Sequence, residues 1–334
     1  MNNIPVTDST ISGDYLSVLL REHYGFSSNT KCNIFRTGIN HSYIVTTPEQ
    51  KYVLRIYSFQ WRTALEISEE IRLLNQLKEH NISVSYPILN LHNEYILELQ
   101  APEGLRYGVL FSFAEGRKVR EFSVDTGYNI GKLMAQLHQV TQNLSLQRIT
   151  YNADSLVLLA YDHAKVHFSE TNEEMQFINQ AVKVIEKEFS ILKPETLRKG
   201  VVHLDIWYDN MHIKNESEMT IFDFDFCGNG WLLHDIAYFI MQMYHHEADK
   251  KLYNTKKAAF FSGYESITSI SEEEKKLLPF SGLSIWIFYL GVQSQRFDNW
   301  SNLFLSENFL KRFMGMAKDW LKFNGIEIKV DNKK

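Results

Sequence analysis

The stretch from Val201 to Asp235 constrains this chain more than any other, because it sets five aspartates into an otherwise apolar segment. The period-two alternation at 221–226 predicts a short strand that carries Asp223 and Asp225 on one face. Carboxylates held that close repel one another, so either one of them is protonated or a cation lies between them. A sparse set of carboxylates suits Mg²⁺, which keeps several waters and takes phosphate oxygens as further ligands. The stretch therefore predicts a site for a metal ion and a phosphate group.

Spacing within the stretch narrows the chemistry. His203, Asp205 and Asn210 follow the pattern His-x-Asp-x-x-x-x-Asn, and Asp223 comes thirteen residues after Asn210. This is the layout of a phosphoryl-transfer loop, in which one Asp receives the proton of the acceptor while an Asn and a second Asp hold the metal. The pattern alone is a weak signal, and the following apolar strand with Asp-x-Asp strengthens it. The alternative is that these aspartates only cap loops and form turns.

The same residues resemble the aminoglycoside phosphotransferase family, which also includes choline and homoserine kinases of that fold. The family pattern is His-Gly-Asp-x-x-x-x-Asn, then an apolar strand that ends in Asp, then an Asp that opens a buried helix. The residues that match this pattern are His203, Asp205, Asn210, Asp223 and Asp235. Leu204 departs from it, because the family usually has Gly there, and this raises the question whether the backbone of the loop is altered.

The resemblance implies an α+β, two-lobed protein-kinase-like fold. A small antiparallel sheet with one helix would form the nucleotide-binding lobe, residues 1–112, and a larger, mostly helical lobe, residues 113–334, would carry catalysis and acceptor binding. The hinge is expected at about 112–116, where the backbone of Phe113 and Ala114 would read the adenine edge. The resemblance is weakest where acceptor specificity would lie.

Composition bounds the remaining possibilities. The chain has 334 residues, 44% of them hydrophobic, which is long for a single compact domain. Its net charge of −5 gives no electrostatic case for binding nucleic acid. The two cysteines lie far apart, which fits a reducing compartment. No signal peptide is evident, and the most apolar run, residues 283–292, is far shorter than a membrane span. We therefore expect a cytoplasmic protein that does not bind a membrane.

A turn at 38–42 is the expected nucleotide loop. It lies between predicted strands at 32–37 and 43–47, and its backbone at Gly38, Asn40 and Ser42 could lay N–H groups against phosphates. The turn by itself is indistinguishable from any hairpin loop. Its position, according to the resemblance, favours the nucleotide.

Arg55, on the strand predicted at 51–58, stands where the family carries the basic residue that reaches the α- and β-phosphates. Lysine is commoner there, although the planar fork of arginine also matches phosphate oxygens. The alternative is an exposed strand arginine. In the helix predicted at 61–80, Glu70 best matches the glutamate that pairs with this residue, and Glu69 is the second choice. Glu66, and whichever of Glu69 and Glu70 does not form this pair, are expected to be solvated surface charges.

Other elements follow from local signals. A helix is predicted from Ser12 or Asp14 to Tyr24, and strands 88–91 and 95–100 are expected to form a hairpin. His138, in a helix predicted at 127–142, is interpreted as a packing residue. The pair His245–His246 is interpreted as a helix end rather than a metal site, because adjacent helical residues do not face each other.

The leading hypothesis is an ATP- and Mg²⁺-dependent phosphotransferase with a hydroxyl acceptor. Asp205 would be the catalytic base, with His203 supporting its loop. Asn210 and Asp223 would bind Mg²⁺, Asp225 would share the metal or form a salt bridge, and Asp235 would hold the catalytic loop by accepting backbone N–H bonds.

The acceptor would be a small metabolite or antibiotic; a protein serine or threonine, as for stress-response kinases, is the alternative. A non-catalytic pseudokinase is a further alternative that Leu204 and Arg55 favour and the intact motif positions oppose. The charge of the acceptor pocket stays open, because local acids such as Glu247 and Asp249 are matched by nearby lysines. The oligomeric state is not predicted.

Overall fold

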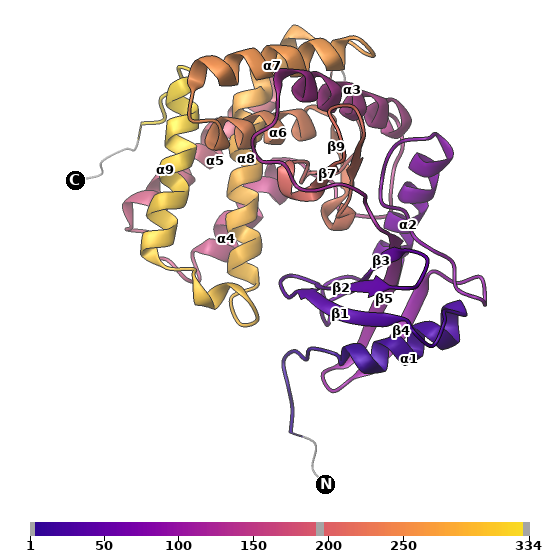
Figure 1. The fold of residues 1–334 in the computed structure, drawn as a ribbon. Helices are drawn as coiled ribbons and strands as arrows, with labels where there is room; N and C mark the ends of the chain where they lie inside the picture. The colour runs from indigo at the N-terminus through magenta and orange to yellow at the C-terminus, as the bar shows by residue number, and fades with distance from the viewer. Residues whose placement is uncertain (1–3, 192–196, 330–334) are drawn as a thin grey trace. The chain divides into compact units, whose positions relative to one another are not determined.

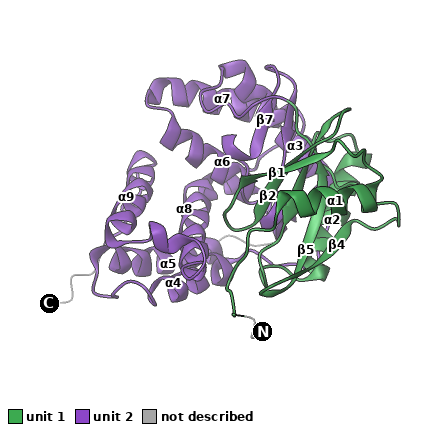
Figure 2. Ribbon diagram, turned by 60° about the horizontal axis from the view of Figure 1, so that its bottom comes forward, with its two compact units in different colours: residues 1–115 green, residues 116–334 purple. Residues whose placement is uncertain are grey.

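The computed structural model describes residues 4–191 and 197–329. The chain divides between Glu115 and Gly116 into two compact units (Figure 2). The first unit is built on an antiparallel sheet and the second is mostly helical, so the α+β prediction is confirmed. Residues 1–3 and 330–334, at the outer ends of the predicted lobes, lie outside the described part. The assignment of nucleotide binding to the first lobe and catalysis to the second stays a prediction.

The first unit is one five-stranded sheet with two helices, where the resemblance implied one helix. The strands pair in the order β1-β2-β3-β5-β4, and all the pairings are antiparallel. In chain order the elements are α1 (Gly13–Tyr24), β1 (Lys31–Arg36), β2 (His41–Thr46), β3 (Lys51–Ile56), α2 (Ala64–Glu79), β4 (Ile96–Ala101) and β5 (Gly104–Ser112).

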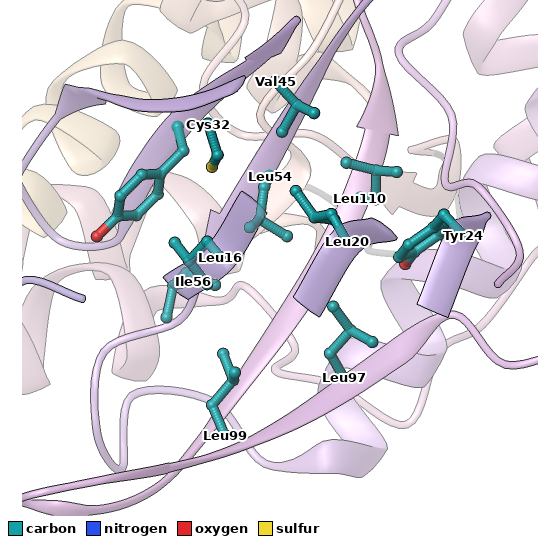
Figure 3. Packing of buried hydrophobic residues seen from close by; sticks show 11 residues of the cluster. Leu16, Leu20, Tyr24, Cys32, Val45, Leu54, Ile56, Leu97, Leu99 and Leu110 are labelled. Carbon is teal, nitrogen blue, oxygen red and sulfur yellow. The ribbon is translucent and has the colours of Figure 1, made fainter. Parts of the chain in front are cut away.

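Helix α1 forms where its end signals predict. Ser12 accepts the backbone N–H of Tyr15 as the N-cap, and Gly25 ends the helix in the left-handed conformation with φ of 67°. Its buried residues Leu16 and Leu20 join alternate strand residues, such as Leu54 and Ile56 of β3, in one apolar cluster (Figure 3). Alternation along β3 therefore assigns one face of the sheet to α1.

Helix α2 packs on the other face. It begins at a capping box in which Thr63 and Glu66 bond each other's backbone N–H groups. Arg55 of β3 lies between Leu54 and Ile56 and so points away from α1, and its guanidinium reaches Glu70 of α2. The sheet thus holds its apolar core on one side and a charged pair on the other.

The expected hairpin of 88–91 with 95–100 is wrong. Strand β4 pairs instead with β5, through a turn at 102–103. The side chain of Asn90 accepts the backbone N–H groups of His92 and Glu94 at 2.8 and 2.9 Å, which bends the chain into a turn there. The apolar residues at 88–91 therefore lie in a loop.

The second unit combines two small antiparallel ribbons, β6–β9 and β7–β8, with helices (Figure 1). The helices are α3 (Val124–Thr141), a π-helical turn (Asp154–Leu158) that continues into α4 (Leu159–Ala164), α5 (Glu173–Ile191), α6 (Leu233–His246), α7 (Lys250–Glu265), α8 (Glu272–Gln295) and α9 (Glu307–Phe323). The strands are β6 (Lys199–Val202), β7 (Met211–Ile213), β8 (Met219–Ile221) and β9 (Gly228–Trp231), with 3₁₀ turns at Tyr208–Asn210, Phe224–Phe226 and Ser301–Leu303.

Two glycines let α3 and α7 approach closely. A Cβ at Gly131 would lie 2.0 Å from the carbonyl oxygen of Phe260, and one at Gly263 would lie 1.9 Å from that of Tyr128. Helix α8 is long and apolar enough to pass for a membrane span, but 72% of its apolar window is buried inside the protein. We therefore interpret α8 as a helix of the protein core.

Candidate functional site

The loop between β6 and β7 brings Asp205 and Asn210 together. The side-chain Nδ2 of Asn210 donates to Oδ2 of Asp205 at 2.7 Å and to the backbone oxygen of Asp205 at 3.0 Å. Both bonds close the loop on itself, since Asn210 lies five residues further along the chain. The side-chain nitrogen of Asn210 is thereby engaged in hydrogen bonds within the loop, and its Oδ1 atom is left for another partner.

Asp235, in the first turn of α6, anchors the start of this loop. Its carboxylate is fully buried and accepts the backbone N–H of His203 at 3.0 Å and of Leu204 at 2.6 Å. The Nε2 atom of His138 lies 3.2 Å from the same carboxylate. Burial acts to raise the pKa of Asp235, but His138 and the backbone N–H of His203 hold that pKa below its ordinary value.

Leu204 adopts the backbone conformation that a glycine would favour. Its φ is +68°, in the left-handed region, and its side chain is fully buried. The departure from Gly therefore leaves the loop in a left-handed turn, held in place by the bond to Asp235. Strain of this kind persists only where the surroundings fix the conformation.

His203 connects the loop to the chain after β8. Its ring is almost fully buried, and burial lowers its pKa, so the ring is neutral at neutral pH. The Nδ1 atom accepts the backbone N–H of Asp205 at 3.2 Å, which places the proton on Nε2, and Nε2 donates to the backbone oxygen of Phe222 at 3.1 Å. His203 thus fixes Asp205 relative to the residue just before Asp223.

The strand predicted at 221–226 is wrong. Strand β8 ends at Ile221, Asp223 has a left-handed backbone with φ of 68°, and residues Phe224–Phe226 form a 3₁₀ turn. The left-handed residue breaks the alternation, so Asp223 and Asp225 are not neighbours on one strand face. Asp225 is 3% exposed, and its backbone oxygen accepts a bond from Arg148.

The carboxyl group of Asp205 has an unusual environment. Burial raises its pKa to about 8, and the negative charge of Asp223 acts in the same direction. Hydrogen bonds from Tyr289, Asn210 and Tyr238 oppose this rise in pKa. Asp205 and Asp223 are therefore close enough to repel each other, which is the situation that a cation relieves.

The donor atoms near Asp205 fit a hard cation. Within residues 4–191 and 197–329, no group of three His, Cys, Asp or Glu side chains is suited to hold a metal. One carboxylate, Asp223, and one amide oxygen, from Asn210, are too few for a protein cage. They suit Mg²⁺, which completes its octahedron with water and phosphate oxygens.

In the first unit the structure brings Arg55 and Glu70 together. The Nη1 atom of Arg55 lies 2.9 Å from Oε1 of Glu70, and the hydroxyl of Tyr57 donates to Oε2 at 3.0 Å. Arg55 is 8% exposed and Glu70 is 1% exposed, so Arg55 is not the exposed strand arginine of the alternative interpretation. Glu69 is buried in an ion pair with Arg72 at 2.9 Å, so the interpretation of Glu69 as a solvated charge is wrong.

The expected nucleotide loop is tied to the end of β3. Oδ1 of Asn40 accepts the backbone N–H of Ser58 at 3.2 Å, and the hydroxyl of Ser58 donates to the backbone of Ile39. Ser42 lies in β2, directly opposite Arg55 of β3. Gly38 precedes the strand, in the bend between β1 and β2. Asn40 and Ser42 are thus held close to the strand that carries Arg55.

The expected hinge residues follow β5 directly. Phe113 and Ala114 lie in a segment without regular secondary structure, just before the division at 115/116. Lys51 Nζ lies 5.7 Å from the centre of the Phe113 ring, and Ala114 is buried.

Sequence reasoning missed several residues around the loop. His138, interpreted as packing, bridges Asp235 and the hydroxyl of Tyr264, which is 2.7 Å from its Nδ1. Tyr238 and Tyr289, which bond Asp205, lie in α6 and α8 and carry no local signal, because only the fold brings them to the loop.

Comparisons with known proteins identify the family of this chain. A model of the phosphotransferase enzyme family matches residues 34–269. An uncharacterized protein of Synechocystis sp. is 30% identical over 304 residues, which cover 90% of this chain and 83% of that protein. A homoserine kinase from Chelativorans sp. is 25% identical over 273 residues, covering 80% of this chain and 81% of the kinase.

Solved structures confirm the expected kinase-like fold. An amicoumacin kinase, solved with AMP-PNP and Ca²⁺, has a TM-score of 0.77 at 18% identity, with 94% of each chain covered. A microcompartment-associated aminopropanol kinase has a TM-score of 0.74 at 17% identity, with 95% of this chain and 100% of that chain covered. Since the family model spans most of the chain, from β1 to the segment after α7, the chain belongs to the phosphotransferase enzyme family and is a phosphotransferase of the kinase type.

Proposed function

We propose that this protein transfers the γ-phosphate of ATP, with Mg²⁺, to a hydroxyl group of a small molecule. The observation that carries the proposal is the fixed position of Asp205, whose carboxylate is bonded by Asn210 and whose loop is anchored by Asp235. Phosphoryl transfer needs positioning more than covalent chemistry, because the transition state is loose and highly charged.

In this proposal Asp205 orients the acceptor hydroxyl and receives its proton. A general base must lie within hydrogen-bond reach of that proton and be held there. The bonds from Asn210, Tyr238 and Tyr289 to its carboxyl group hold Asp205 in one orientation. His203 supports the loop through its hydrogen bonds to the backbone of Asp205 and of Phe222.

Asn210 Oδ1 and the Asp223 carboxylate would hold Mg²⁺, with Asp225 as a third candidate ligand. Bound Mg²⁺ would supply positive charge to the nucleotide phosphates. The same positive charge would offset the repulsion that Asp223 exerts on Asp205 and would favour the ionised form of Asp205 that a base requires.

Arg55 would bind the nucleotide phosphates, oriented by Glu70, with Gly38 and Asn40 of the adjoining loop and Ser42 of β2. The support is the buried ion pair of Arg55 with Glu70 and the pairing of Ser42 with Arg55 across the sheet. The backbone at Phe113 and Ala114 would bind the adenine. We expect the reaction to take place in the cytoplasm.

The comparisons favour a small acceptor. Relatives named homoserine kinases, and similar structures named for amicoumacin and aminopropanol, are small-molecule kinases. No contact in the described structure favours a protein acceptor. Leu204, which favoured a pseudokinase, keeps the left-handed backbone at the loop.

The direct test measures ADP formation from ATP with a panel of hydroxyl compounds that includes homoserine, amino alcohols, sugars and aminoglycosides. We expect turnover that depends on both Mg²⁺ and one acceptor class. Tight nucleotide binding without acceptor-dependent turnover for any compound would contradict the proposal and favour a pseudokinase.

A further inference from the structure

A hollow of about 360 Å³, counted with the open space at its mouth, lies within the second unit beside the catalytic loop. Trp207 and Tyr208, from that loop, form part of its wall. Gln242 of α6 forms another part, and its Nε2 atom donates to the hydroxyl of Tyr238 at 2.7 Å. Tyr238 in turn is hydrogen-bonded to Asp205. A single tyrosine therefore connects the wall of the hollow to the carboxyl group of Asp205.

The one carboxylate among the described residues that line the hollow already forms an ion pair and a backbone hydrogen bond. Glu247 Oε2 accepts from Lys256 Nζ at 2.7 Å, and its Oε1 accepts the backbone N–H of Asp249 at 3.2 Å. Asp209, which follows Tyr208, is paired with Lys118 at 2.7 Å. A cationic ligand would thus meet carboxylates that are already neutralised by lysines.

The aromatic rings of the hollow are engaged as well. The guanidinium carbon of Arg120 lies 5.2 Å from the centre of the Tyr208 ring, and Lys256 Nζ lies 5.1 Å from that of Phe122. The Trp207 ring stacks on His246 with 5.9 Å between centres. An aromatic cage for an ammonium group needs open ring faces. Here two of the rings already face a cation of the protein.

Hydrogen-bond donors, in contrast, are in excess. Arg120 is exposed and forms no ion pair or hydrogen bond with any described residue. Trp207 Nε1, a donor, is buried and lacks a hydrogen-bond partner among the described residues, and the same holds for His246 Nε2, whose donor or acceptor role depends on the tautomer of the ring. Burial, and the charge of Arg120, lower the pKa of His246 to about 4, so His246 is neutral at neutral pH. The charges that line the hollow then sum to one excess positive charge, which is that of Arg120.

We propose that this hollow binds the acceptor and selects a small hydroxyl compound that carries an anionic group, held by Arg120. A guanidinium binds carboxylate and phosphate groups in the same two-bond geometry, so both sources fit. Polycationic aminoglycosides and quaternary amino alcohols would meet repulsion from Arg120 instead. This inference rests on the proposed function, because it takes Asp205 as the group that faces the acceptor hydroxyl.

A matched set of three-carbon alcohols tests the charge selection. Glycerate, glycerol phosphate, glycerol and serinol differ mainly in carrying a carboxylate, a phosphate, no charge or an ammonium group. We expect turnover to be most efficient with one of the two anions and least efficient with serinol. Preference for glycerate identifies a carboxylate site, and preference for glycerol phosphate identifies a phosphate site. A preference for serinol or an aminoglycoside overturns the inference.

The residue assignment is tested with Arg120→Gln, and Arg312→Gln is the control because it makes the same charge change at an exposed position of α9 outside the hollow. The ratio of the KM for the preferred anion to that for glycerol should rise by about 10- to 100-fold in Arg120→Gln, the scale of one charge-assisted contact. It should not change in Arg312→Gln. An equal rise for anion and glycerol would contradict the inference.

Ligand-detected NMR separates this inference from the proposed function, because it needs no turnover. Glycerate or glycerol phosphate should bind the parent protein and Asp205→Ala, and binding should be lost in Arg120→Gln. If that pattern holds while Asp205→Ala retains full activity, the anion site stands and the role of Asp205 fails. If neither anion binds the parent protein, the anion site fails.

Discussion

The carboxylate of Asp235 holds the backbone N–H of Leu204 at 2.6 Å, and Leu204 is kept there in a left-handed conformation with φ of +68°. A buried leucine is an uncommon residue in that conformation, since its Cβ costs roughly 1–2 kcal/mol there. Two terms therefore act at this position. The buried side chain stabilises the fold, and the strained backbone opposes it.

These two terms predict an unusual order of stability for substitutions of Leu204. Leu204→Ala removes buried apolar atoms but keeps the strain, while Leu204→Gly removes one carbon more and relieves the strain. Both variants should have a lower free energy of unfolding than the parent, and Leu204→Gly should be the more stable of the two by about 1 kcal/mol. Denaturant unfolding measures the order. An alanine variant more stable than the glycine variant would show that no strain is stored here.

Arg55 and Glu70 should act as one unit. Arg55→Ala should raise the KM for ATP and lower kcat, and Arg55→Lys should restore only part of the loss, because an ammonium cannot reproduce the planar fork. In a double-mutant cycle with Glu70→Ala, we expect coupling of about 0.5–3 kcal/mol in kcat/KM for ATP. Strict additivity would mean that Glu70 does not orient Arg55 in the active enzyme.

The metal assignment predicts unequal effects for its two ligands. Asp223→Asn and Asn210→Ala should both shift the Mg²⁺ dependence of nucleotide binding to higher concentration. The shift should be larger for Asp223→Asn, because it removes a full charge. A titration of Mg²⁺ at fixed ATP measures both shifts. Mg²⁺ curves identical to that of the parent would exclude these residues as ligands.

His234 predicts how stability depends on pH. Its ring is fully buried, with Nδ1 2.7 Å from the hydroxyl of Ser281, and burial lowers its pKa to about 4. The unfolded chain, with a pKa near 6.5, binds the proton more readily, so the contribution of His234 is present above about pH 6.5 and is lost as the pH falls towards 4. Fully developed, that contribution is about 3 kcal/mol.

The measurement is the free energy of unfolding between pH 7 and pH 4.5. His234→Gln should make this pH dependence less steep, and the exposed control His92→Gln should leave it unchanged. If His234→Gln follows the parent curve with the same slope, the acid sensitivity arises elsewhere.

The sequence predicts those parts of the fold and site that depend on residues close together in the chain. The cap residues Ser12 and Gly25 delimit α1 because capping needs only neighbouring residues. The pairing of Arg55 with Glu70 was predicted from the positions that a basic strand residue and a helix glutamate occupy in the family. The strand at 221–226 failed because alternation cannot reveal that Asp223 has a left-handed backbone.

The parts that could not be predicted depend on long-range packing. Tyr238 and Tyr289 reach Asp205 from two separate helices, and residues of the loop and of α6 line the hollow near Gln242. Ion pairs such as Glu247 with Lys256 decide the charge of the hollow, and the sequence shows only that both residue types are nearby. The net charge of the hollow therefore follows from the structure and not from the sequence alone.

The central claim is that Asp205 acts on the acceptor and not on the nucleotide. Asp205→Ala should bind ATP and Mg²⁺ as the parent protein does, and its kcat for phosphate transfer should fall by roughly 10²–10⁴, the usual scale for a positioned acid–base group. Single-turnover transfer from labelled ATP, measured beside nucleotide binding on the same samples, tests this most directly. Unchanged binding with transfer slowed to that extent is the predicted result, and transfer at the parent rate would contradict the account.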